Sequence, residues 1–541
     1  MSSIAWATAA FAQAAAAPAA AARAAPVQTA PPLAEQAPSD QIQPAPVLVR
    51  PKPIKLAQLS GPPTEVAQAP PTQADVLERA SSSPTAPKDP YPVEAAGWSK
   101  PRSFQFFDSR WEEDWSTLQK EGKAPPLKAM PLFGNDQITL TLSAEDRFRV
   151  HFYGNGQLTD HNNYEEIQNR TIVGADLHIT DHFRFYTELG HADLTENGHP
   201  DVQSVQAKQE SSLTLQQAFG EFREEYKGVL AGAMIGRMEY TDAPEQLISA
   251  GNGPNLHQTW NGYRLYLHTH WFRVGYFQAY PTDDFFGYAF NQGISHEEYI
   301  RSASGSAALV QVSDRFNVFL DPLYVETFNS KGTAGPSTGE DHRYTFGSRL
   351  WGRLDRVTFD WMAYQQTGFH AGRDVSAWLA SFSQNVKFNP FSLPTTVGFR
   401  VDGASGGDAF NKTGTLHLFN PLYVDKGIFG EAELFSYQNL FLIAPTFTVR
   451  PIPRYRITAE YDFLWKQNRN DAFYTPTKAY TGTESIRDKY AGAMVRINNF
   501  YDLTNNVFFR LELDQMSVGP LLRRAHFSDS YVVMPDITLR Y

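Results

Sequence analysis

The stretch "VGADLHITDHFRFYTELG", residues 173–190, shows the unit from which the chain is built. Apolar and polar side chains alternate on both sides of a short turn at Asp181. The apolar set is Ala175, Leu177, Ile179, Phe183, Phe185 and Leu189, and the polar set is Asp176, His178, Arg184, Tyr186 and Glu188. A period of two with one apolar face predicts two antiparallel strands joined as a hairpin.

The same unit recurs from Asp146 to the last residue. Short turns are predicted near Asp181, Lys227, Thr269, Asp314, Asp355, Ser392, Ile452 and Asp502. Longer polar connections are predicted near Asn162, His199, Gly251, Asp284, Gly335, Gly372, Gly407, Tyr474 and Leu521. Seventeen connections join about eighteen strands, and short and long connections alternate. An even strand number with this alternation is typical of a closed antiparallel transmembrane β-barrel. A soluble β-sandwich or propeller is the alternative all-β fold.

Composition narrows the class of protein. The formal net charge is −11, which argues against a nucleic-acid partner, because such a protein needs a basic face. The chain has no cysteine, which excludes a disulfide scaffold. Mean hydropathy is −0.40, and no stretch approaches the roughly 20 consecutive apolar residues of a membrane helix. A helical membrane protein is therefore excluded.

The front of the chain differs from the strand-rich part. The first fourteen residues, 1–14, resemble a secretory signal, although basic residues are missing before the apolar run and an Ala-rich tail is the alternative. Residues 15–103 are dominated by Ala, Pro, Gln, Ser and Thr and are predicted to be a disordered linker. Residues 104–135 are predicted to form a short periplasmic segment, helical over Arg110 to Lys120, and residues 136–541 the barrel.

The alternation also assigns side chains to the inside of the barrel. The inward arginines are Arg147, Arg149, Arg184, Arg264, Arg343, Arg349, Arg454, Arg456, Arg510 and Arg540. The inward carboxylates are Asp176, Glu188, Asp360, Glu460, Asp462, Glu512 and Asp514. Ten arginines against seven carboxylates predict a lumen that favours anions, because fixed positive charge selects them. For any single arginine, bracing of the wall is the alternative, as for Arg510 with Glu512 or Arg456 with Glu460.

The residues predicted to line the pore are Arg149, Arg184, Arg264, Arg343, Arg349, Arg456, Arg510, Glu460 and Asp462. Glu460 and Asp462 share a strand face as a glycosidase pair would, but neighbouring arginines favour a salt-bridged pair. His268 and His270 lack a third metal ligand. No phosphate-binding loop or nucleophile elbow is present. The sequence therefore predicts neither catalysis nor a metal or cofactor.

Several words of the sequence resemble the alginate export family, in the same order. They are "IGRMEYTDAPEQLISAGNGPNLHQTWNGYRL" from Ile235, "HRYTFGSRLWG" from His342, "VDGASGGDAF" from Val401, "FNPLYVDKGIFGE" from Phe419, "QNLFLIAPTFTVRP" from Gln438 and "NRNDAFY" from Asn468. The resemblance covers residues 146–541. It implies an outer-membrane barrel of about eighteen strands that secretes an anionic uronate polysaccharide through an arginine-rich constriction, with inner loops that gate the pore.

Two functions follow as expectations. The first is export of an anionic, alginate-like polysaccharide from a bacterial outer membrane, with outer-membrane lipid and periplasmic secretion or polymer-modifying proteins as further partners. The alternative is a general or small-anion uptake porin. A soluble all-β carbohydrate enzyme is a third class, and migration in detergent gels would separate it from a barrel.

The chain ends in "SDSYVVMPDITLRY", which alternates to the last residue. A closed barrel must pair its last strand with its first, so this strand cannot be a loose tail. Its terminal Tyr541 resembles the aromatic C-terminal signal of outer-membrane barrels. Pro535 cannot donate to a ladder and predicts a bulge at that point.

Overall fold

Alternation of apolar and polar side chains makes each segment a strand with one face for a nonpolar solvent and one for a polar interior. The computed structural model describes residues 106–107, 109–197, 210–251, 255–284, 289–313, 315–424 and 426–541. The predicted signal segment and nearly all of the predicted linker lie outside these residues. Within them, no helix has the length and hydropathy of a membrane span.

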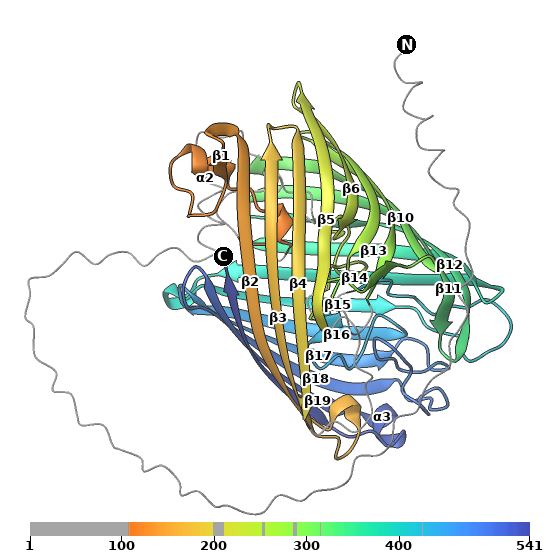
Figure 1. Ribbon diagram of the computed structural model, residues 1–541. Coiled ribbons are helices and arrows are strands. Elements are labelled where there is room, and N and C mark those ends of the chain that lie inside the picture. The colour runs from red at the N-terminus through yellow and green to blue at the C-terminus, as the bar shows by residue number, and fades with distance from the viewer. Residues whose placement is uncertain are drawn as a thin grey trace, which may run out of the picture. The chain divides into compact units, whose positions relative to one another are not determined.

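Eighteen long antiparallel strands form one closed sheet, which confirms the predicted fold class (Figure 1). The first nine are β2 (Asn135–Gly154), β3 (Tyr164–Ile179), β4 (Phe183–Asn197), β5 (Ser211–Tyr226), β6 (Val229–Met238), β7 (Trp260–His268), β8 (Phe272–Asp284), β10 (Glu298–Ser313) and β11 (Phe316–Ala334). The other nine are β12 (Ser337–Leu354), β13 (Val357–His370), β14 (Arg373–Phe388), β15 (Thr395–Ala404), β16 (Leu440–Ile452), β17 (Tyr455–Lys466), β18 (Tyr490–Asp502), β19 (Val507–Val518) and β20 (Ser530–Arg540).

Small elements complete the described chain. Two three-residue strands, β1 (Met130–Leu132) and β9 (Gln292–Ile294), pair with β2 and β8. The helices are η1 (Arg110–Glu112), α2 (Ser116–Lys120), η2 (Gly156–Leu158), η3 (Pro390–Ser392), η4 (Lys426–Phe429) and α3 (Pro520–Arg524). The helix predicted from Arg110 to Lys120 is thus present as two short pieces, η1 and α2.

The ring closes at a seam between the first long strand and the last. β2 pairs with β20 in antiparallel register, with Arg147 opposite Thr538. Pro535 lies opposite Leu511 on β19 without a shift of register, so the predicted bulge is wrong. On the other side of β20 the register is also constant, but the ladder has no pairs between Arg149 and Phe152 of β2. The missing donor of Pro535 is therefore accommodated by a gap in the seam ladder and not by an extra residue.

The connections define two ends of the barrel. All eight predicted short turns lie at one end, here called the short-turn end, together with the start of β2 and the end of β20. The opposite end, here called the long-loop end, carries the longer connections. Two of the predicted long connections are wrong: only Gly335 and Pro336 separate β11 from β12, and only Ala371 and Gly372 separate β13 from β14.

The outward face is apolar and aromatic, as a lipid-facing surface requires. Phe185 is 52% exposed and Phe346 is 46% exposed, whereas the inward neighbour Arg184 is 3% exposed. The predicted outward residues Leu265 and Tyr461 are exposed as well. The alternation read from the hairpin at Asp181 is confirmed: Arg184, Tyr186 and Glu188 point inward and are buried.

Two long connections fold into the barrel and supply much of its core. The connection between β6 and β7, residues 239–259, is here called inner loop 1, and the connection between β15 and β16, residues 405–439, inner loop 2. They meet at a parallel bridge between Ile248 and Tyr423. Buried apolar residues of inner loop 2 include Phe419, Phe429 and Phe435, each at most 1% exposed.

The segment before the barrel also enters it. Residues 106–128, of which 106–107 and 109–128 are described, are here called the strap. Ser109, Arg110 and Trp111 are buried, and the Trp111 ring lies edge-on to Phe219 of β5, with centroids 5.8 Å apart. Part of the segment predicted to be periplasmic thus lies against the inner wall.

Candidate functional site: a lumen with a filled side and an open wall

The predicted pore-lining arginines on β2, β4 and β7 lie inside the barrel but hold other parts of the chain. Arg149 pairs with Asp536 at 2.9 Å and with Glu431 of inner loop 2 at 3.3 Å. Arg184 pairs with Asp176 at 2.7 Å and donates to the backbone carbonyl of Trp111 in the strap. These side chains are 2–3% exposed. Their donors are used within the protein, so bracing describes them better than contact with a solute.

Arg264 and Arg343 are committed in the same way. Arg264 makes a two-point contact with Asp242 of inner loop 1, at 2.7 and 2.5 Å. Arg343 pairs with Asp341 on its own strand at 2.8 Å and donates to the carbonyl of Leu418 in inner loop 2 at 2.9 Å. Planar guanidinium groups suit this task because one side chain can bind a carboxylate and a carbonyl together.

The other side of the lumen is more open. Along the short-turn halves of β12 to β19 the inward side chains are only partly buried, and this surface is here called the open wall. Its inward cations are Arg349, Arg353, Lys387, Arg450, Arg456 and Arg510, and small polar residues such as Ser383, Asn385, Thr446, Thr448 and Asn498 lie between them. Three of the predicted pore-lining arginines therefore belong to one continuous, solvent-accessible face.

Arg450 and Arg456 differ from the other arginines of this face. The Arg456 guanidinium lies 4.2 Å from the centroid of the Phe500 ring, and Arg510 approaches the same ring at 5.7 Å. Among the described residues neither Arg450 nor Arg456 forms an ion pair, and the Arg456 Nε has no hydrogen-bond acceptor. The predicted Arg456–Glu460 pair is wrong. The open wall thus carries two adjacent guanidinium groups whose charge is not neutralised by a contact carboxylate.

Arg349 and Arg510 are neutralised at least in part. Arg349 binds Asp360 through two contacts, at 2.8 and 2.5 Å. Arg510 pairs with Glu512, as predicted, and with Glu431 at 2.9 Å. Because Asp360 is on the same face, the positive character of the open wall is concentrated around Arg450 and Arg456 and is not spread along its length.

Glu460 and Asp462 form a salt-bridged cluster, as the sequence indicated. Arg496 of β18 pairs with both, reaching Asp462 at 2.8 Å, and Arg400 of β15 reaches Glu460 at 2.7 Å. Asp462 is fully buried. Two arginines shared between two carboxylates leave no free acid and base across a substrate-sized gap, which a glycosidase needs.

The predicted excess of inward arginine over carboxylate is wrong for the part of the chain that the structure describes. Among its buried side chains, carboxylates outnumber arginines and lysines. Inward acids that sequence reasoning missed include Glu145, Glu221, Asp321, Asp341, Asp402 and Asp536, and missed arginines include Arg170, Arg400 and Arg496. Arg400 and Asp402 alternate on one face of "GFRVDGA", a signal that the period of two contains.

Glu431 of inner loop 2 is a further residue that sequence reasoning missed. It lies between Arg149 and Arg510, and its backbone N–H donates to Glu512 at 2.9 Å. Burial by itself raises its pKa, but the two guanidinium groups prevail and hold the pKa of Glu431 well below its usual range. Glu431 is therefore an ionised anchor that fixes inner loop 2 against β2 and β19.

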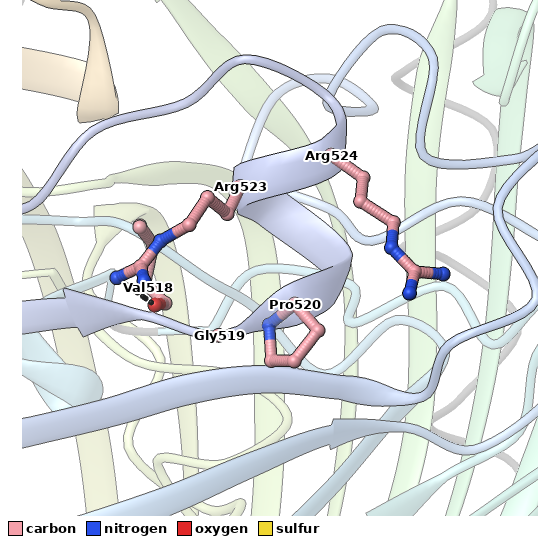
Figure 2. A pocket seen from close by; sticks show the side chains of 5 residues that line it. All are labelled: Val518, Gly519, Pro520, Arg523 and Arg524. Carbon is pink, nitrogen blue, oxygen red and sulfur yellow. Dashed lines mark hydrogen bonds between the residues drawn. The ribbon is translucent and has the colours of Figure 1, made fainter.

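The long-loop end carries a small pocket apart from the open wall. It has a volume of about 270 Å³ and is lined by Val518, Gly519, Pro520, Arg523 and Arg524 (Figure 2). The two arginines leave α3 on opposite sides. Arg523 donates to the Val518 carbonyl at 3.1 Å and Arg524 pairs with Asp488. The pocket belongs to the packing of α3 against loop 467–489.

Among the described residues, no group of three or more His, Cys, Asp or Glu side chains is arranged to hold a metal ion. His268 lies on the inward face of β7, and His270 stands in the turn that follows, where its ring contacts Trp271. The lumen therefore offers charged and polar side chains as its chemistry.

A model of the alginate export family matches residues 139–533. The chain belongs to the alginate export family. The match spans nearly the whole barrel and both inner loops. Membership of this family, together with a closed barrel of eighteen strands, indicates an outer-membrane channel.

Solved porin structures show similar barrels. They include OpdO of Pseudomonas aeruginosa, with 11% identity, a TM-score of 0.46 and coverage of 74% of this chain and 96% of that chain. A BenF-like porin from Pseudomonas fluorescens Pf-5 has 11% identity, a TM-score of 0.48 and coverage of 74% and 99%. OccAB1 of Acinetobacter baumannii has 10% identity, a TM-score of 0.48 and coverage of 74% and 96%. A search of curated proteins finds no match.

Proposed function

We propose that the protein exports an anionic, uronate-type polysaccharide across the bacterial outer membrane. The observation that carries this proposal is the pair Arg450 and Arg456 on the open wall, in a chain of the alginate export family. The net charge of the chain is −11, so an anionic polymer needs local attraction to enter. The two unpaired guanidinium groups supply it near the short-turn end.

Conduction proceeds by weak, repeated contacts. A sugar carboxylate binds a guanidinium on the open wall and is released to the next cation along the strands, as ions pass between adjacent sites in a channel. The polar side chains Asn385, Thr448 and Asn498 offer hydrogen bonds to sugar hydroxyls along the same face. Tight, multivalent binding would stop transport, so an open wall with few free cations suits a polymer that must keep moving.

Planar-bilayer recordings of the purified protein test the proposal. We expect anion-selective conductance that uronate oligomers block. The double substitution Arg450→Gln with Arg456→Gln should weaken both. One unit charge at about 7 Å in water contributes about 0.6 kcal/mol, or roughly threefold in local anion concentration, so the loss of two charges should be clear.

A matched control removes an arginine from the outer face. Arg301 of β10 is partly exposed and pairs with Glu326 at 3.3 Å, so Arg301→Gln should leave selectivity unchanged. Cation preference without oligomer block would contradict the proposal. Block by small acids alone, with growth on those acids lost when the gene is deleted, would support the uptake porin instead. Loss of secreted polysaccharide on deletion would support export and, with it, periplasmic polymer-modifying partners.

A further inference from the structure

We propose that the strap is a movable wall of the short-turn opening: while it is docked, residues 109–113 restrict that opening, and their release widens it. The proposal concerns the width of the opening and rests on the proposed function only for what passes. It assigns a role in selection by size to a segment that precedes the barrel in the chain.

The strap occupies lumen that would otherwise be open. Trp111 is 6% exposed, and its ring contacts Phe219 while the Arg184 guanidinium lies 5.8 Å from its centroid. Arg184 also donates to the Trp111 carbonyl. These contacts place a large side chain on the inner wall of β4 and β5. On this side the lumen is filled, so solutes are confined to the open wall opposite.

A second set of contacts ties the strap to inner loop 1. The Ser109 hydroxyl donates to Glu239, and the Thr241 hydroxyl donates to Glu112 at 3.0 Å. Inner loop 1 is itself fixed to the barrel, because Asp242 binds Arg264 and Asn255 accepts from Arg147 at 3.2 Å. The strap thus lies between the barrel wall and a loop that the family resemblance already associates with gating.

The strap is held less firmly than the barrel strands. Among the described residues, the backbone hydrogen bonds of residues 109–113 outside regular strands are local, from Glu112 to Ser109 and from Glu113 to Arg110. Strand neighbours share continuous ladders, whereas this segment is attached through side chains. Local opening costs least where backbone ladders are absent, so the strap can leave while the barrel stays closed.

A reversible crosslink in the full-length protein tests the proposal. The chain has no cysteine, so the double substitution Ser109→Cys with Glu239→Cys introduces one pair at a point of direct contact. A short, reducible thiol crosslinker then locks the strap. In planar bilayers with KCl, we expect the locked protein to remain in its smaller conductance state. Reduction should restore excursions to a roughly twofold larger conductance, since conductance follows the open cross-section of a pore.

The control pair is Glu297→Cys with Lys331→Cys, which replaces an exposed ion pair of 2.6 Å near the long-loop end. Its crosslinking should not change conductance. Trp111→Ala should increase the time spent in the larger state, and Trp111→Phe should restore most of the wild-type behaviour. Equal conductance before and after reduction of the strap crosslink would overturn the proposal. Because this readout uses KCl alone, it remains valid even if uronate export is disproved.

Discussion

Single side chains in this barrel act mainly as fasteners. Lys466, at the end of β17, shows this most clearly: its ammonium group donates to the carbonyls of Arg469, Asp471, Thr483 and Ile486, at 2.7–3.1 Å. One charge thereby draws together both arms of loop 467–489. A single cation with four carbonyl acceptors satisfies groups that the loop cannot satisfy by itself.

We expect Lys466→Met to loosen this loop without opening the barrel. The substitution leaves buried carbonyls without a donor, at about 1–3 kcal/mol for each one that water does not reach. Limited proteolysis should then cut between residues 467 and 489, while the barrel fragment stays folded. Lys489→Met is the control, because Lys489 is exposed and donates to one carbonyl, that of Gln467. An uncut loop in the Lys466 variant would contradict the fastening role.

At the scale of elements, the strap responds to the ionisation of Glu112. Burial, with the nearby carboxylates of Glu239 and Asp242, raises the pKa of Glu112 from 4.5 to about 7, against the lowering effects of the Thr241 hydroxyl and Arg264. The docked strap therefore favours the protonated acid. Docking free energy is complete below pH 4.5 and is lost as the pH rises through about 7, by about 2–3 kcal/mol.

We expect trypsin to cleave after Arg110 more readily at pH 7.5 than at pH 5.5, because Arg110 is buried in the docked strap. Glu112→Gln removes the titrating group and serves as the reference at each pH. Its cleavage should vary only with the activity of the protease. A wild-type profile that follows the Glu112→Gln profile would show that this group does not control docking.

The last strand and the strap stabilise each other. Tyr541 exchanges two backbone hydrogen bonds of 2.8 Å with Ala144 of β2, and Arg110 donates to its carbonyl at 2.6 Å. The Lys128 ammonium lies 5.2 Å from its ring. Deletion of Tyr541 should therefore impair assembly far more than the small area of this side chain suggests. Normal amounts of the shortened protein in outer membranes would argue against that role.

At the scale of the whole molecule, the closed ladder predicts resistance to detergent. Every strand of the ring has two neighbours, so the sheet has no edge from which to unravel. The protein should migrate faster in detergent gels before boiling than after. Arg149→Ala should lower the temperature of this shift, because it leaves Asp536 and Glu431 buried without their partner, at about 3–5 kcal/mol. Identical migration before and after boiling would argue against a closed barrel.

The strand count could be predicted from the sequence because alternation is a local property. The hairpins at Gly335 and Gly372 were mistaken for loops for a physical reason. About 9–11 residues of a tilted strand span the membrane, whereas β11 has 19 residues and β12 has 18. The parts beyond the membrane are polar and therefore resemble loops in composition.

The contents of the lumen could be predicted less well. Inner loops contribute Glu239, His257 and Glu431 to pairs with strand residues, and no spacing along the chain indicates that a loop turns inward. One signal was present: "GIFGEAELFSY" carries too many apolar residues for a connection exposed to water. The partners of Arg456 and Arg496 likewise depend on register between strands, which a single sequence does not contain.

The gap in the ladder beside Pro535 has a consequence for how the protein is made. The seam joins residues separated by nearly the whole barrel in sequence, such as Arg149 and Asp536, so it bears the largest entropy cost of any strand pairing. It is also the pairing with missing hydrogen bonds. We therefore expect the seam to form last, and the ion pair of Arg149 with Asp536 to decide whether a nearly complete sheet commits to a ring or stays open.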